Sequence, residues 1–339
     1  MAKHRGRGFA TIEYPTGMNQ NGDPSQAWIK LKPDGRVDVF SGTVDIGQGS
    51  KTVHTQIVAD ALGVPYDWVT MDNSNTDSSA VCTGTFASRG TFIGGNAVRL
   101  AAERVRERIL DIASKELEID ASDLELANGE VTAKGAPQKS INVADVAGAA
   151  TYNYGELISG SSTALKPFAD VDDATGQVEI EPHSAISYAA CVADVEVDDE
   201  TGETTVLKML QVYDVGRAIN PTLAEGQVEG GIHMGLGHAL SEEYVVEGGR
   251  PVTETLKSLN IIPPLGMPEV EVILVEVPQP EGPYGAKGVG EGPLVPTASA
   301  VAGALYKFDG VRRTRLPMKD SAAAKFAVPK LAAAGRREG

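Results

Sequence analysis

One stretch, residues 284–305, limits what this chain can fold into more than any other part of its sequence. It reads YGAKGVGEGPLVPTASAVAGAL, with four glycines in eight residues and Glu291 between the last two of them. Glycine at this density allows positive φ angles and close approach by other groups. Pro293 suits the first turn of a helix. Apolar residues then recur at helical spacing, namely Leu294, Ala298, Val301 and Leu305. The sequence therefore predicts one carboxylate at the mouth of a tightly packed helix.

Glu291 admits two interpretations on this pattern alone. A carboxylate at a helix N-terminus is most often a partner of the helix dipole, which contributes about 0.3–1 kcal/mol. The other interpretation is a functional carboxylate held on thin backbone, where a ligand can approach it. Only the rest of the chain can decide between the two.

Composition excludes several classes of protein. A net charge of −16 and a pI near 4.8 argue against nucleic acid or an anionic membrane as partner. No run of 18 apolar residues is present, and no apolar segment follows the basic residues at the start of the chain. The only two cysteines, Cys82 and Cys191, are too few for an iron–sulfur cluster or a structural zinc site. We therefore expect a soluble, cytoplasmic protein.

The first half of the chain alternates hairpins and helices. Residues 27–41 predict a hairpin that turns at Pro33-Asp34-Gly35. The later elements are a helix from Gly49 to about 63, a strand at 68–71, a helix to about 117, a hairpin at 128–129 and a helix at 143–149. We expect the polar residues 151–182 to cross a surface without regular structure.

The second half repeats this pattern. Residues 187–216 predict a longer hairpin, and residues 219–240 predict a glycine-rich helix that again contains a Gly-Gln pair. Strands at 242–246 and 270–277 and a short helix after residue 322 follow. The recurrence suggests an internal repeat of a hairpin followed by a helix.

Three further glycine-bearing segments carry groups suited to binding. Gly47-Gln48-Gly49, residues 85–91 and Gly226-Gln227 each place backbone N–H groups or small polar side chains near an expected helix start. Such segments hold phosphates and heterocycles without a fixed charge. None matches the P-loop or the dinucleotide-binding pattern. Each segment by itself is more often only a turn.

Together these segments resemble a known family. GTVDIGQG, GTFASRGTFIGGNAVRLAA, GQVEGGIHMGLG and GAKGVGEGPLVPTASAVAGAL, in this order, are similar to the molybdopterin-binding subunit of the xanthine dehydrogenase family of molybdenum hydroxylases. The resemblance covers about residues 8–318 but only the C-terminal part of the usual large subunit. The chain resembles a separately encoded half of that large subunit, like the medium molybdopterin subunit of nicotinate dehydrogenase.

The resemblance implies roles for individual residues. Glu291 matches the family's catalytic base, and the backbone beside it would lie close to the molybdenum ligands. The residues implied to contact the cofactor are Gly47, Gln48, Gly49, Ala87, Ser88, Gly90, Thr91, Gln227, Gly288, Val289 and Gly290. Gly90 stands where the family often has a hydroxyl residue, so that one contact is not carried over. No residue is expected to ligate the metal directly.

The resemblance also implies a fold and partners. We expect an elongated α+β molybdopterin-binding domain with two α/β subdomains, residues 1–165 and 166–325, and a tail at 326–339. The cofactor would be molybdopterin with molybdenum, in the cytosine dinucleotide form. FAD and [2Fe-2S] clusters would lie on a flavin subunit and an iron–sulfur subunit. A further chain would carry the N-terminal half of the molybdenum subunit, in a dimer of heteromers.

The expected reaction is hydroxylation of an N-heteroaromatic carbon, as in nicotinate, with oxygen from water. Purine and aldehyde substrates are the alternatives. A different class of function stays open as well, namely a scaffold that holds the cofactor without taking part in catalysis. The intact Gly-Val-Gly-Glu sequence at 288–291 favours the catalytic subunit, because a scaffold has no need of the carboxylate.

Overall fold

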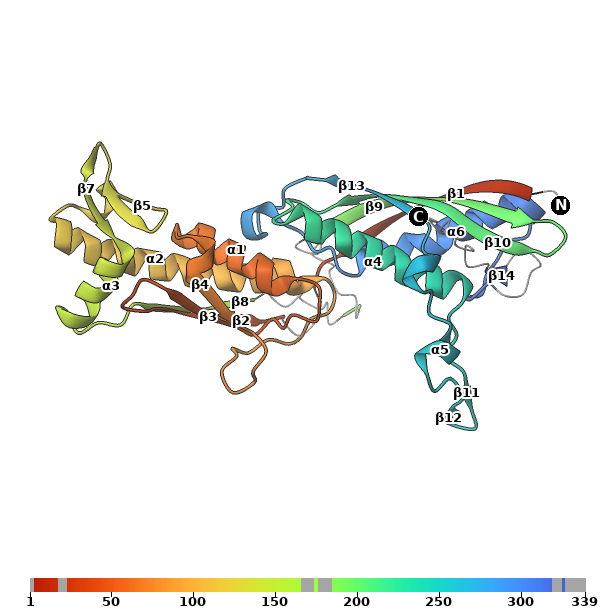
Figure 1. Ribbon diagram of the computed structural model, residues 1–339, viewed down its shortest axis with the longest axis horizontal. Helices are drawn as coiled ribbons and strands as arrows, with labels where there is room; N and C mark the ends of the chain where they lie inside the picture. The colour runs from red at the N-terminus through yellow and green to blue at the C-terminus, as the bar shows by residue number, and fades with distance from the viewer. Residues whose placement is uncertain (1–2, 18–22, 166–173, 176–184, 319–324, 327–339) are drawn as a thin grey trace, which may run out of the picture.

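Two β-sheets, each packed against a pair of helices, form the two halves of an elongated molecule (Figure 1). The computed structural model describes residues 3–17, 23–165, 174–175, 185–318 and 325–326. Each half has its own buried apolar cluster, one from Ala27 to Ala185 and one from Ala189 to Met318. The α+β class expected from the sequence is confirmed. Among the described helices, none combines the length and apolar character needed to cross a membrane.

The first half is built on a four-stranded sheet in the order β4-β3-β2-β8. β2 is antiparallel to both β3 and β8, and β3 is parallel to β4. Ala27, Ile29 and Leu31 alternate with more exposed residues along β2 and point into the core. The elements are β2 (Ser25–Leu31), β3 (Val37–Ser41), α1 (Ser50–Leu62), β4 (Val69–Asp72), α2 (Gly95–Leu117) and β8 (Ser159–Ala164).

A small sheet and one helix complete the outer end of this half (Figure 1). Its strands are β5 (Leu124–Ala127), β6 (Glu130–Ala133) and β7 (Ala136–Asn142), followed by α3 (Val143–Tyr152). Asn128 and Gly129 both have positive φ, as a two-residue hairpin turn requires. The hairpin predicted at these two residues is therefore confirmed.

The second half has the sheet order β1-β9-β10-β13, with a short strand β14 beside β10. Helices α4 and α6 lie along one face of this sheet (Figure 1). The main elements are β1 (Lys3–Pro15), β9 (Ile186–Asp198), β10 (Glu203–Asp214), α4 (Pro221–Leu240), β13 (Glu269–Val275), α6 (Val295–Asp309) and β14 (Lys325–Phe326). An arm formed by β11 (Val246–Glu247), β12 (Arg250–Pro251) and α5 (Leu256–Leu259) projects from it (Figure 1).

The two halves share one chain order. An antiparallel hairpin, a helix, a strand parallel to the second hairpin strand and another helix occur as β2-β3-α1-β4-α2 and as β9-β10-α4-β13-α6. A further antiparallel strand lies beside the first hairpin strand in each half, β8 in one and β1 in the other. The repeat suggested by the sequence is therefore present in the topology.

The position of β1 differs from the expectation that residues 1–165 form one subdomain. β1 pairs with β9 from Lys3↔Asp198 to Pro15↔Ile186 and so belongs to the second sheet. The close approach of α6 explains why glycine is needed there, because a Cβ at Gly8 would overlap the carbonyl oxygen of Ala300. β1 therefore belongs to the second half, although it precedes the first half in sequence.

Several local predictions were wrong. Residues 159–164, expected to be irregular, form β8, because the open edge of β2 pairs with them. The strand predicted at 242–246 is absent except for Val246, which begins the two-residue strand β11. The helix predicted to begin at Pro293 is preceded by a 3-10 turn, Gly292–Leu294. In the tail, where we expected a short helix, Lys325–Phe326 is a strand, and the other residues after 318 lie outside the described part of the chain.

Candidate functional site

A cavity of about 220 Å³ lies where the two halves meet, and all four glycine-bearing segments contribute to its wall. Its lining includes eight of the predicted site residues: Gln48, Ser88, Gly90, Thr91, Gln227, Val289, Gly290 and Glu291. The other four, Gly47, Gly49, Ala87 and Gly288, flank it in the same segments without lining it. Segments as far apart in sequence as Gln48 and Glu291 therefore converge on one space.

The first segment is a turn that is fixed from within. Gly47 and Gly49 have φ angles of 105° and 84°, which glycine adopts at little cost. The Asp45 carboxylate accepts hydrogen bonds from the N–H groups of Gly47 (2.8 Å), Gly49 (3.3 Å) and Lys51 (2.9 Å), at the start of α1. Partial burial opposes ionisation, but these N–H groups outweigh it and lower the pKa of Asp45. The turn that presents Gln48 is thus held by a charged acceptor.

Gln48 itself is also anchored. Its Nε2 donates to the carbonyl of Val44 at 3.0 Å, and its Oε1 accepts from the N–H of Ile46 at 2.6 Å. These two bonds fix the plane of the amide at the cavity wall. A flat polar ligand would therefore meet an amide that is already oriented.

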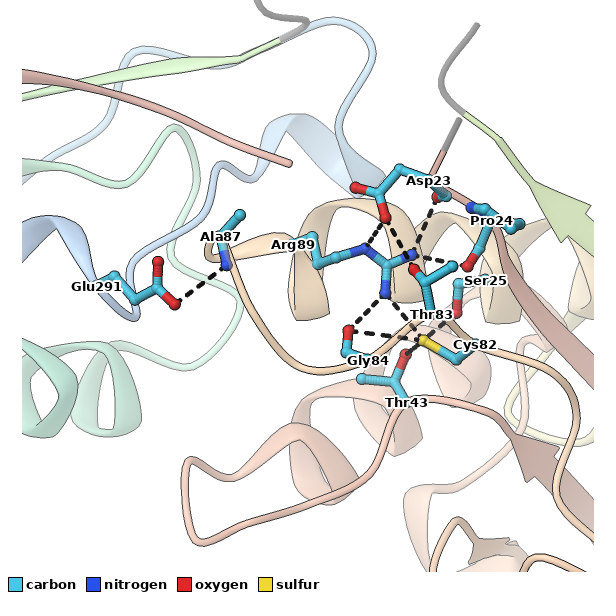
Figure 2. A network of polar contacts seen from close by, with 10 residues as sticks. All are labelled: Asp23, Pro24, Ser25, Thr43, Cys82, Thr83, Gly84, Ala87, Arg89 and Glu291. Carbon is cyan, nitrogen blue, oxygen red and sulfur yellow. Dashed lines mark hydrogen bonds and ion pairs between the residues drawn. The ribbon is translucent and has the colours of Figure 1, made fainter. Parts of the chain in front are cut away.

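The second segment is tied down by a fully buried arginine (Figure 2). The Nε of Arg89 lies 2.5 Å from Asp23 Oδ1, and its Nη2 donates to the carbonyls of Asp23 (3.0 Å) and Pro24 (2.8 Å). Its Nη1 donates to the carbonyl of Gly84 at 2.7 Å and lies 2.9 Å from the Cys82 sulfur. A buried guanidinium needs its charge paired and its donors satisfied. Asp23 pairs the charge, and the two terminal nitrogens of Arg89 make the hydrogen bonds.

This anchoring allows an unusual backbone just before Arg89. Ala87 and Ser88 have φ angles of 48° and 53°, in the left-handed region that L-residues seldom adopt. In that conformation the N–H of Ala87 and the hydroxyl of Ser88 face the second half of the molecule. Arg89 and Asp23 therefore act as the support of the loop that meets Glu291.

Glu291 connects this loop to the second half (Figure 2). Its Oε1 accepts from the N–H of Ala87 at 3.1 Å, and its Oε2 accepts from the hydroxyl of Tyr14. Its own backbone N–H donates to Ser88 Oγ at 2.8 Å. The residue is exposed in this chain, and its carboxylate lines the cavity.

The backbone before Glu291 approaches the loop closely. A Cβ at Gly288 would overlap the carbonyl oxygen of Ser88, so no other residue fits there. The Gly288 carbonyl accepts from the hydroxyls of Ser187 (3.1 Å) and Tyr213 (3.3 Å). Lys287 forms a buried ion pair with Asp214 at 2.5 Å. The glycines thus let two backbone segments from different halves pack at the cavity.

Gln227 reaches the cavity from within α4, the glycine-rich helix predicted at residues 219–240. The Gly226-Gln227 pair does not precede a helix start but lies within α4, which begins at Pro221. The side chain still contributes to the cavity wall because α4 passes beside it. The resemblance to Gly47-Gln48 in sequence is therefore not a resemblance in local structure.

The histidine beneath the cavity gives a pH-dependent prediction. His54 is fully buried in α1, and its Nε2 donates to the carbonyl of Gly90 at 3.0 Å. Burial lowers the pKa of His54 to about 4, against the smaller opposing effect of that carbonyl. Between pH 6.5 and 4 the unfolded chain binds a proton that the folded chain does not. Stability should therefore fall below pH 6.5, by about 3 kcal/mol in full.

We expect His54→Gln to flatten this dependence, measured as the free energy of unfolding in denaturant at pH 7 and at pH 5. The exposed His238 in α4 offers a control, and His238→Gln should leave the slope unchanged. Equal slopes in the wild type and in His54→Gln would exclude His54 as the cause.

Several residues that build this site were not predicted from the sequence. Tyr14 and Asp23 carry no motif, since their roles depend on contacts across the chain. Asp45 lies inside the GTVDIGQG segment, and its contacts are local, with the N–H groups of the next few residues. Arg89 stood within a highlighted segment, but nothing in a sequence distinguishes a buried arginine from an exposed one. The expected residues were found because they lie in glycine-rich segments, which can be recognised in the sequence.

Comparison with known proteins decides the family. A family model described as a molybdopterin cofactor-binding domain matches residues 1–266. The chain belongs to the xanthine dehydrogenase family of molybdopterin-binding subunits. It is 32% identical over 328 residues to a putative xanthine dehydrogenase molybdenum-binding subunit of Escherichia coli (strain K12), covering 93% of this chain and 41% of that protein.

Other members of the family are similar over the same region. The nicotine 6-hydroxylase large subunit of Paenarthrobacter nicotinovorans is 30% identical, over 82% of this chain and 33% of that subunit. The crystal structure of quinoline 2-oxidoreductase from Pseudomonas putida 86 superposes with a TM-score of 0.77 at 30% identity, over 89% of this chain and 39% of that one. This chain therefore spans well under half the length of these relatives.

Proposed function

We propose that this chain binds the molybdenum cofactor in the cavity between its halves and supplies Glu291 as the base of a hydroxylase. The single observation that supports this most is the position of Glu291. Among the residues that the structure describes, Glu291 is the one carboxylate in the cavity lining, and it is the residue that the family resemblance implies as the base. The proposed substrate is an N-heteroaromatic compound of the nicotinate type.

The cavity suits a pterin cofactor in its chemistry. The amide of Gln48, the amide of Gln227 and the hydroxyls of Ser88 and Thr91 offer neutral donors and acceptors. These match the alternating polar edge of a flat heterocycle. Gly90 and Gly290 bring backbone to the surface without a Cβ, so the ligand can lie close. When bound, the cofactor's molybdenum supplies the two-electron oxidation of the substrate carbon.

A second, smaller cavity lies next to the first, and it favours the dinucleotide form of the cofactor. It shares Gln48, Thr91, Gln227 and Val289 with the main cavity and continues to Arg217. A guanidinium at that end would pair with a phosphate. The cytosine base itself is an inference from the family, and analysis of the nucleotide released from purified protein would test it.

The role of this chain's residues in the reaction would be to accept one proton and to position the group that accepts it. Glu291 accepts it on its carboxylate, which must be ionised and aimed into the cavity. The Ala87 N–H steadies Oε1 by a hydrogen bond, and Ser88 Oγ fixes the Glu291 backbone. Since the loop that carries these groups is supported by Arg89, the base is positioned before substrate arrives.

Additional polypeptides would complete the site. Glu291 is exposed in this chain, and the relatives are more than twice as long as the matched region. We propose that a further chain carries the remaining half of the molybdenum subunit and covers the cavity. An iron–sulfur subunit and a flavin subunit would receive the electrons, in a dimer of heteromers. Both cysteines are free thiols, which supports a cytoplasmic location.

The substrate is proposed from two named relatives. Nicotine 6-hydroxylase and quinoline 2-oxidoreductase are named for N-heteroaromatic compounds, which favours that class here. Purines come second, because the Escherichia coli relative is named for xanthine. Aldehydes come third, and the scaffold without catalysis is the alternative of a different class.

Purification of the assembled complex from its native source tests this proposal. We expect molybdenum, iron and flavin in the preparation, together with a partner chain, and turnover of nicotinate in preference to xanthine and aldehydes. A complex with bound molybdenum but no oxidation of any of these three classes would leave only the scaffold. Preference for xanthine would replace the substrate assignment.

Retention of the cofactor gives a second expected result. Replacing Gln48 or Ser88 by Ala removes a hydrogen-bonding group from the cavity wall that a bound cofactor would bury, at a cost of about 1–3 kcal/mol of binding. The molybdenum content of the purified complex should therefore fall in both variants. As a matched control, Gln26→Ala changes a glutamine on β2 outside the cavity lining and should keep full content. Full molybdenum occupancy in Gln48→Ala and Ser88→Ala would contradict the assignment.

A further inference from the structure

Tyr14 donates a hydrogen bond to the Glu291 carboxylate and has no part in the function proposed so far. It is the next-to-last residue of β1 and pairs with Ser187 of β9. The chain directly after it is fixed on both sides. The N–H of Thr16 donates to the carbonyl of Ala185 at 2.9 Å, and that of Gly17 donates to the carbonyl of Ala87 at 2.8 Å. Tyr14 is thus held in place by the second sheet and by the loop of the first half.

The hydroxyl of Tyr14 completes the hydrogen bonding of the Glu291 carboxylate. One carboxylate oxygen accepts from the Ala87 N–H in the first half, and the other accepts from Tyr14 in the second. Two donors at opposite oxygens fix the rotation of a carboxylate, which one donor alone leaves free. Each oxygen keeps a further lone pair for a proton.

The phenol remains a donor throughout the working pH range. Burial first, and then the hydrogen bond to Glu291, raise the pKa of Tyr14, while the Ser88 hydroxyl acts in the opposite direction. Tyr14 is absent from the cavity lining, whereas Glu291 is part of it. The phenol therefore touches the carboxylate and not the space in which a substrate would react.

We propose that Tyr14 is a positioning residue for Glu291, and that its phenol holds the carboxylate so that the accepting lone pair faces the cavity. This inference rests on the proposed role of Glu291 as the base. An unfixed carboxylate would spend much of its time turned away from the reacting proton. The loss of the phenol should therefore reduce the chemical step and leave substrate binding unchanged.

The first experiment uses Tyr14→Phe in the assembled complex. The ring is kept and only the donor is removed, so we expect kcat per bound molybdenum to fall about tenfold, with KM and molybdenum content unchanged. Tyr188→Phe is the matched control, because Tyr188 lies on the adjacent strand β9 with its side chain 56% exposed. It should retain wild-type kcat. A wild-type kcat in Tyr14→Phe would overturn the proposal.

A second measurement does not depend on turnover. Labelling of carboxyl groups with a carbodiimide and an amine, followed by peptide mass spectrometry, reports how accessible each carboxylate is. Tyr14→Phe should increase labelling of Glu291 several-fold, while labelling of Asp214, buried against Lys287, should stay the same. Unchanged labelling at Glu291 would show that the phenol does not hold the carboxylate. Increased labelling at both would mean only general loosening and would also overturn the proposal.

A double-mutant comparison separates this inference from the proposed function. In a Glu291→Gln background, Tyr14→Phe should cause no further loss of kcat, since the group that it positions is gone. An equal loss in both backgrounds would assign Tyr14 a structural role only. If Glu291→Gln alone keeps wild-type turnover, the proposed function fails. If that variant is inactive but Tyr14→Phe is fully active, only the positioning role fails.

Discussion

Replacing Glu291 by Gln should reduce turnover per bound molybdenum by about 10²- to 10⁴-fold, the usual contribution of a general base. The amide keeps the size of the side chain, and its oxygen can still accept one of the two hydrogen bonds from Ala87 and Tyr14. What it loses is the ability to take up a proton. Because the backbone N–H bond to Ser88 is unaffected, the complex should assemble and keep its molybdenum.

The measurement is steady-state turnover normalised to molybdenum, with a thermal melt to check folding. Glu254→Gln provides the matched control, because Glu254 is exposed on the segment between β12 and α5. It should retain wild-type turnover. If Glu291 were only a partner of the helix dipole, its replacement would cost less than about 1 kcal/mol of stability and leave turnover nearly intact. That result would favour the scaffold over the catalytic subunit.

The secondary structure could be predicted where local signals are strong. Gly63 ends α1 with a left-handed φ of 68°, and the Asn128-Gly129 turn closes its hairpin as the sequence indicates. The strand β8 could not be found this way, since Ser159–Ala164 consists only of Ser, Thr, Gly and Ala. Its strand conformation comes from pairing with β2. The same holds for β1, whose residues pair with residues of β9 that lie 171 (Pro15↔Ile186) to 195 (Lys3↔Asp198) positions away in sequence.

The candidate site was predictable only in outline. Close approach of two backbone segments requires glycine, as at Gly288 against Ser88, and clustered glycines can be recognised in the sequence. Side chains that act by long-range contact cannot be recognised in this way. Tyr14 and Asp23 read as ordinary residues of a strand and a loop, and only the folded chain brings them to Glu291 and Arg89. Sequence therefore indicated which segments form the cavity, but not the groups that hold those segments in place.

Replacing Arg89 by Met should be among the most damaging single changes in the chain. It leaves Asp23 buried without its cation and removes donors to the carbonyls of Asp23, Pro24 and Gly84. Breaking one side of a buried ion pair typically costs about 3–5 kcal/mol. The loop that carries Ala87 and Ser88 in left-handed conformation would lose its support. We expect a lower unfolding temperature, little bound molybdenum and no measurable turnover.

Two companion variants show whether the loss arises from the network. Arg99→Met removes a guanidinium that is paired with Glu103 on the surface of α2, and it should cost less than about 1 kcal/mol. Arg89→Lys keeps a charge beside Asp23 but cannot reach all four acceptors, so it should fall between the wild type and Arg89→Met. Stability would be measured by thermal melt and molybdenum by metal analysis. If Arg89→Met resembled Arg99→Met in both, the loop would be held by its own backbone, and Arg89 would have no supporting role.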